Sequence, residues 1–169
     1  MQTTAPRIVG PEDGKAVSLG SIGARFMVYA EESGGGFSLV EHPMPARHLA
    51  APLHRHSRED EYSFVLEGRM GALLGDDVVH AEPGDLVFKP RNQWHTFWNA
   101  GDEPCRILEI ISPAGFERYF DELGDLLGGG PPDPAVIMPL AARYGLEMDP
   151  GSIPGLIERF DLKFGPEGG

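Results

Sequence analysis

Between residues 52 and 112, short apolar segments are separated again and again by turn residues. The turns are marked by Gly68, by the Gly-Asp-Asp segment 75–77 and by the Pro-Gly-Asp segment 83–85, which are residue types that favour tight chain reversals. Strands that recur about every 8–12 residues are typical of a β-sandwich or β-barrel. The sequence therefore predicts an all-β domain in this region.

The segments on either side extend this prediction. Residues 24–30 and 37–46 have the composition of further strands, and Pro43 and Pro45 restrict the second one to an edge or end it. The chain is expected to divide into an N-terminal arm or edge strand (1–24), a β-barrel (25–112) and a C-terminal helical extension with a tail (113–169).

After residue 112 the apolar residues follow a helical period. The residues that fall on one stripe of a helix are Phe116, Tyr119, Phe120, Leu123 and Leu127. Gly128 is expected to end this helix. A second helix is expected to begin at Asp133-Pro134 and to end near Tyr144-Gly145, with Pro139 kinking it or delaying its start. The last residues are expected to fray.

The charge and the apolar content limit the classes of partner. The formal net charge is -12, which argues against nucleic acid and anionic membrane surfaces because both require a cationic face. The N-terminus has no apolar segment like that of a signal peptide, and no stretch approaches the ~18 apolar residues of a membrane span. We therefore expect a cytoplasmic protein whose partner is a small molecule.

A few side chains have the spacing of metal ligands. His54 and His56 are two residues apart and would project from the same face of a strand. Glu61 follows His56 by five residues, an odd offset that requires a bulge or turn at 57–60. With His95, three imidazoles and one carboxylate would bind a divalent first-row metal at roughly 2.0–2.2 Å. The neighbouring acids, Glu59 and Asp60, are expected to be solvated loop residues, although either could replace Glu61 as the ligand if the loop shifts by one residue.

This arrangement resembles the two motifs of the cupin family. His54, His56, Glu61 and Gly68 match the first motif, and Gly84, Pro90, His95 and Asn99 match the second. Two glycines of these motifs are replaced, by His48 and Asn92, and Asn tolerates the left-handed conformation that such a glycine serves. The resemblance covers residues 25 to 112. It implies a small antiparallel jelly-roll barrel with inward ligands and one divalent transition metal, with Fe, Mn, Ni, Co and Zn all open.

Strand alternation adds neighbours to this ligand set. Ser63 and Val65 share a face with Glu61, and Phe97 and Asn99 share a face with His95. We take Ser63, Phe97 and Asn99 as candidate substrate-binding residues, although Phe97 and Val65 are equally well explained as barrel core. The remaining side chains with metal-binding chemistry lack ligand spacing: His42, His48, which is the best candidate of the three for the entrance, His80, which should face solvent, and Cys105, which is expected to be a buried structural thiol.

Within the cupins, a single barrel with four ligands and a C-terminal helical extension resembles the quercetin 2,3-dioxygenase-like proteins. This resemblance implies a metal-dependent dioxygenase acting on a flavonol-like or other enolisable aromatic substrate, with Glu61 as the catalytic base and dioxygen as the second substrate. A non-redox metalloenzyme (isomerase, cyclase or lyase) and a non-catalytic binding protein stay open. Edge strands are usually covered, so a homodimer is expected, with residues 1 to 20 pairing with the partner barrel.

Overall fold

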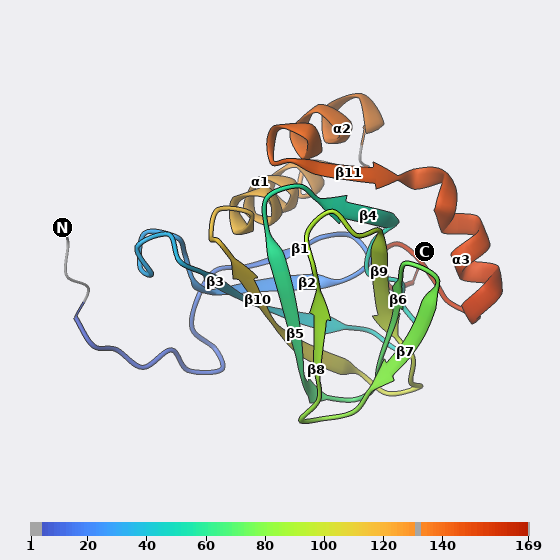
Figure 1. Ribbon diagram of the computed structural model, residues 1–169, viewed down its shortest axis with the longest axis horizontal. Coiled ribbons are helices and arrows are strands. Elements are labelled where there is room, and N and C mark those ends of the chain that lie inside the picture. Colours follow the sequence, from blue (N-terminus) through green and yellow to red (C-terminus); the bar gives the residue numbers. More distant parts are fainter. Residues whose placement is uncertain (1–4, 131–132, 169) are drawn as a thin grey trace.

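The computed structural model of the protein describes residues 5–130 and 133–168, and it consists mainly of two antiparallel sheets (Figure 1). The six-stranded sheet has the order β1 (Ala16–Ser18), β2 (Gly23–Val28), β3 (Ser38–Met44), β10 (Cys105–Ser112), β5 (Asp60–Glu67) and β8 (Leu86–Lys89). The five-stranded sheet has the order β11 (Leu146–Asp149), β4 (Leu53–His56), β9 (His95–Asn99), β6 (Met70–Leu74) and β7 (Asp77–Ala81). The predicted all-β jelly-roll barrel is confirmed.

Alternation along the strands directs apolar side chains into the space between the sheets. On β10, Cys105, Ile107, Glu109 and Ile111 are buried, whereas the alternate residues Arg106, Leu108 and Ile110 are half-buried. Val65 on β5 and Met70 on β6 are fully buried in the same apolar cluster as Ile107. Burial of each such side chain stabilises the fold by about 1.5–3 kcal/mol, so this cluster is the main core of the barrel.

Three helices follow the barrel: α1 (Glu117–Leu127), α2 (Pro134–Arg143) and α3 (Ile153–Phe160), the last preceded by a 3-10 turn, η1 (Pro150–Ser152). Both predicted helices are confirmed. Asp133 caps α2, because its carboxylate accepts a hydrogen bond from the Ala135 N–H at 2.8 Å. Pro139 lies inside α2. The buried stripe of α1 packs with Phe26, Val40 and Ile111 of the six-stranded sheet.

The C-terminal extension is more than the helical segment that was expected. Residues Leu146–Asp149 form β11, which pairs with β4 so that Leu146 lies opposite His56. The indole of Trp98 on β9 stacks on Phe160 of α3 at 4.2 Å between ring centroids. Leu162 is buried, so the expectation of fraying is wrong for this part of the tail. The extension therefore completes one sheet of the barrel and covers its outside.

The N-terminal segment contains the edge strand that was expected, and the pairing of residues 1 to 20 with a partner barrel stays a prediction. β1 is this edge strand, and it pairs with β2 of its own chain, with Ala16 opposite Arg25. Residues 16–18 thus extend their own sheet, whereas a part of the arm, residues 1–4, lies outside the described residues. Cys105 is buried, and this burial raises the pKa of its thiol to about 11, as expected for a structural thiol.

Among the described residues, no helix combines the length and the apolar character that crossing a membrane requires.

Candidate metal centre

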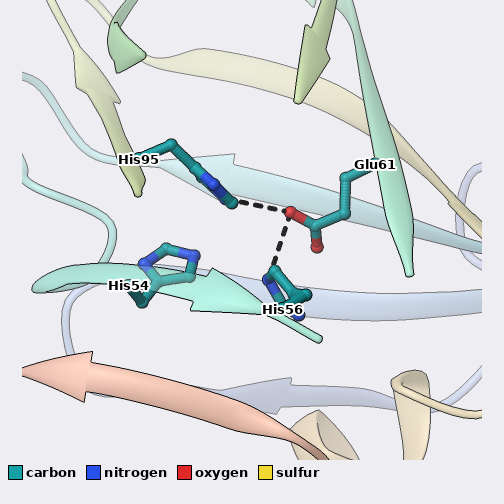
Figure 2. Close-up of side chains that lie close together, drawn as sticks. All are labelled: His54, His56, Glu61 and His95. Carbon is teal, nitrogen blue, oxygen red and sulfur yellow. Dashed lines mark hydrogen bonds and ion pairs between the residues drawn. The ribbon is translucent and has the colours of Figure 1, made fainter. Parts of the chain in front are cut away.

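Four side chains from three strands meet at one end of the barrel interior (Figure 2). His54 and His56 lie on β4, and His95 lies directly opposite His54 on β9. Glu61 comes from β5 in the other sheet, because the turn that follows β4 carries the chain from one sheet to the other. This crossing confirms the turn that the odd spacing required. We call this region the histidine end of the barrel.

The four groups are close and shielded from solvent. One ligand atom from each lies within 4.8 Å of all the others, and none of the four residues exceeds 6% exposure. The Oε2 atom of Glu61 lies 3.3 Å from Nε2 of His56 and 3.3 Å from Nε2 of His95. The carboxylate oxygen therefore faces two imidazoles at once (Figure 2).

Backbone carbonyls orient two of the imidazoles. Nδ1 of His54 donates to the carbonyl oxygen of Pro52 at 2.7 Å, and Nδ1 of His95 donates to that of Gln93 at 3.0 Å. Each ring then has its Nε2 lone pair free for the centre. Burial holds the pKa of His54 well below its usual value and also lowers the pKa of His95. Both rings are thus neutral near pH 7, the form that binds a metal.

His56 has a different neighbour, and it corrects one expectation. Glu59 is buried, not solvated, and its Oε2 atom lies 3.8 Å from Nδ1 of His56. Burial raises the pKa of Glu59. Within the described part of the chain, neither ring nitrogen of His56 has a hydrogen-bond partner. Buried polar atoms without partners are rare in proteins, and here they match the donor set of a divalent metal. Asp60 meets its expectation as a surface acid, paired with Arg91.

The turn before β9 is hydrogen-bonded to β4 at the histidine end of the barrel. Asn92 has a φ of 66°, the left-handed conformation that the motif normally assigns to glycine. Its backbone N–H donates to the carbonyl oxygen of His56 at 2.7 Å. The substitution of Gly by Asn is therefore accommodated as expected, and it places His95 beside β4.

Two buried charged residues beneath the centre were not anticipated. Nζ of Lys89 lies 2.9 Å from Oε2 of Glu109 and 3.4 Å from Oε2 of Glu61. Burial, opposed by the Lys89 charge, raises the pKa of Glu109 to about 7. The sequence did contain a signal, because each charge interrupts an otherwise apolar inward alternation: Val87 precedes Lys89, and Glu109 lies between Ile107 and Ile111.

The predicted substrate-binding residues lie in different places. Ser63 is fully buried and donates to Oε2 of Glu109 at 2.8 Å. Phe97 lies under the Lys89 ammonium, 4.5 Å from it, and belongs to the apolar core. Asn99 is a correction, because its amide donates to three backbone carbonyls, those of Met44, Pro45 and Glu103. It joins loops about 13 Å further along β9 from His95 and so holds the far end of the barrel together.

Aromatic side chains cover the histidine end. Phe116, at the start of α1, contacts His56 with 4.4 Å between ring centroids. Tyr119, Phe120 and Tyr144 surround Phe116. The helical stripe of α1 was predicted, but its position over the centre was not, because a stripe does not say what it packs on.

The other three histidines lie outside the four-residue cluster. His42 faces inward and donates to the Gly23 carbonyl oxygen at 2.8 Å, and burial lowers its pKa to about 4. His48 is buried and donates to the carbonyl oxygen of Ala46, and its own carbonyl oxygen accepts from the Asn99 N–H, so it lies at the other end of β9 from His95. His80 is exposed, as expected.

The comparisons with known proteins agree with this geometry. Residues 41–111 match the family described as Cupin domain. The tetracenomycin polyketide synthase protein TcmJ of Streptomyces glaucescens is 30% identical over 86 residues, which are 51% of this chain and 56% of that protein. Quercetin 2,3-dioxygenase of Bacillus subtilis strain 168 is 28% identical over 72 residues, which are 43% of this chain and 21% of that protein. The match thus spans about half or less of these curated relatives.

A solved structure extends the likeness beyond the matched motifs. The polyketide cyclase RemF from Streptomyces resistomycificus superposes with a TM-score of 0.54 and 28% identity, over 64% of this chain and 80% of that chain.

Proposed function

We propose that this protein is a metal-dependent dioxygenase of a flavonol-like or other enolisable aromatic substrate. Residues 41–111 match the Cupin domain family, and the barrel interior holds a buried cluster of three histidines and one glutamate. The observation that carries the proposal is the cluster itself: three imidazoles and a carboxylate converge in the barrel interior, and among the described residues neither ring nitrogen of His56 has a hydrogen-bond partner. The likeness to a quercetin 2,3-dioxygenase supports the reaction class.

The metal would be held by His54, His56, His95 and Glu61. When bound, it supplies a Lewis acid for an ionised substrate oxygen and, where the metal permits it, a centre for reaction with dioxygen. Three imidazoles and one carboxylate suit Fe, Mn, Ni, Co and Zn alike, so the identity of the metal is left to experiment.

The chain's own residues would perform two tasks. The Glu61 carboxylate has two oxygens, so it can serve as a ligand and also accept the proton of a substrate enol or phenol. The aromatic group around Phe116 and Tyr119 would exclude water and offer ring faces to an aromatic substrate. Together these residues favour an aromatic substrate that carries one acidic hydroxyl group.

A second candidate is a non-redox cyclase that acts on an aromatic polyketide. The specific observation in its favour is the likeness to RemF and to TcmJ, both of which are polyketide proteins by name. The same ligand set would then act without dioxygen. The homodimer and the absence of nucleic-acid and membrane partners stay predictions.

The test is dioxygen uptake with quercetin by protein reconstituted separately with Fe(II), Mn(II), Co(II), Ni(II) and Zn(II). We expect uptake with at least one of the first four metals, none with zinc and none with the His95→Ala variant. Blanks without substrate correct for dioxygen that free Fe(II) consumes. Stoichiometric metal binding without uptake would contradict the dioxygenase proposal, and conversion of a polyketide substrate under argon would favour the cyclase.

A further inference from the structure

A buried ammonium lies between the histidine end and the apolar core. The Lys89 side chain has 0% exposure and that of Glu109 has 1%. Burying charges costs several kcal/mol per ion even when they are paired. An apolar pair would pack here at no such cost, so the charges require an explanation beyond stability.

The contacts of Lys89 join the two buried carboxylates. Its Nζ atom lies 2.9 Å from Oε2 of Glu109, 3.4 Å from Oε2 of Glu61 and 4.5 Å from the centre of the Phe97 ring. Ser63 also donates to Oε2 of Glu109 at 2.8 Å, which fixes the orientation of that carboxylate. The ammonium is therefore held in place from the side remote from Glu61.

The oxygen of Glu61 that Lys89 approaches is the one that faces the histidines. Oε2 lies 3.3 Å from Nε2 of both His56 and His95. A donor behind this oxygen keeps the carboxylate turned toward the imidazoles. Without a counter-charge, the Lys89 ammonium would also compete with a metal cation for this oxygen. It would repel the cation as well, because like charges repel strongly in a low-dielectric interior.

We propose that Lys89 is a positioning residue that holds the Glu61 carboxylate toward the metal, and that Glu109 is the counter-charge that keeps the ammonium from competing with the metal. Glu109 cancels the Lys89 charge locally, and Glu61 keeps its own charge for the cation. This inference rests on the proposed metal centre.

The same sheet offers a matched control. Glu41 is also a buried carboxylate paired with a cation, Arg25, at 2.7 Å. It lies on β3, opposite Leu108 of β10, and its Oε2 atom also approaches Arg106 on the outer face. Glu41→Gln therefore removes a buried, paired carboxylate from this sheet without touching the histidine end.

The experiment titrates Co(II) into the metal-free full chain and records affinity and visible absorption spectrum. Loss of an outer-shell partner typically weakens metal binding by about 10–100-fold, and we expect this of Glu109→Gln. The double variant Lys89→Met/Glu109→Gln should recover most of the lost affinity, because no ammonium is left to compete. Its Co(II) spectrum should still differ from that of the wild type, because Glu61 is no longer held.

The controls separate the possible failures. Glu41→Gln should change neither affinity nor spectrum, and thermal unfolding of each metal-free variant shows that it is folded. Unchanged affinity in Glu109→Gln, or equal weakness in the double variant, would overturn the inference. If Glu109→Gln does not fold, the double variant Lys89→Met/Glu109→Gln tests the inference by itself. A Co(II) spectrum identical to that of the wild type would then exclude the positioning role of Lys89. Failure of the wild type to bind Co(II) would instead refute the metal centre itself.

Discussion

The two ends of the barrel interior are built by the same strands but differ in chemistry. β5 contributes Glu61 at the histidine end and Val65 at the other, and β9 runs from His95 into the core at Phe97. At the apolar end, Val65, Met70 and Ile107 are completely buried and have no polar side-chain atoms to satisfy. At the histidine end, both ring nitrogens of His56 and one oxygen of Glu59 lack a hydrogen-bond partner within the described residues.

This contrast separates stability from function. Apolar packing is favourable by itself, whereas buried polar groups without partners are costly. A chain that places them at one end of an otherwise packed barrel departs from the pattern that stability alone would select, and such departures are expected at functional sites. The two ends should therefore respond differently to substitution.

The largest effect is expected from His56→Ala at the histidine end. Removing one imidazole of the four-residue cluster should leave little metal bound after reconstitution and dialysis, because the remaining three groups no longer enclose the ion. Metal content per chain, measured by inductively coupled plasma mass spectrometry, checks this, and His80→Ala serves as the control because His80 is exposed. Unchanged occupancy would rule out His56 as a ligand.

The next effect sharpens the role of Glu61. Glu61→Gln keeps an amide oxygen but no longer accepts a proton, so turnover should fall more than metal content. Substrate conversion per bound metal ion separates the loss of turnover from the loss of metal. Asp60→Asn is the control in the neighbouring residue, since Asp60 pairs with Arg91 at the surface. An empty site in the Gln variant would make Glu61 chiefly a ligand, and full activity would exclude it as the base.

At the apolar end, Ile107→Ala should reduce stability and spare the metal. Ile107 is fully buried, and Ile→Ala in a packed core costs about 2–5 kcal/mol in the free energy of unfolding. Denaturant unfolding of the metal-free protein measures this loss. Metal content per folded chain should equal that of the wild type, and a parallel loss of metal would mean that the two ends are not independent.

The smallest effect concerns pH and the buried His42. Burial lowers the pKa of His42 to about 4 in the folded chain, from 6.5 in the unfolded chain. Between these two pH values the unfolded chain is protonated at this residue and the folded chain is not. The contribution of the neutral imidazole to the free energy of unfolding is therefore fully present above the unfolded-state pKa. It decreases as the pH falls from there toward the folded-state pKa. Lowering the pH from about 7 to about 5 should cost about 2 kcal/mol through this residue.

The measurement is the free energy of unfolding of metal-free protein across this pH range. His54 and His95, whose pKa values are also lowered, add acid sensitivity of the same sign. The difference between the wild type and His42→Leu isolates the contribution of His42. Identical pH slopes in the two proteins would contradict the prediction.

Much of the fold and of the site could be predicted because the signals are local. Alternation and turn residues located most of the barrel strands. The spacing of His54, His56 and Glu61, together with the resemblance to the cupin motifs that include His95, named the cluster that the structure brings together. The residues that were misplaced depend on how the chain packs, which residue type and spacing do not show. Glu59 looked like a loop acid but lies beside His56, and Asn99 binds carbonyls from segments as far away as Met44.

What the sequence determined by itself was most of the barrel strands, the face on which their side chains lie and the chemistry of the donors, because all three follow from residue type and a period of two. The tertiary structure decided which faces meet. It joined β11 to β4, placed Phe116 over His56 and set Lys89 between Glu61 and Glu109. These contacts depend on how the two sheets and the C-terminal helices pack, and packing over such separations leaves no local pattern in the chain.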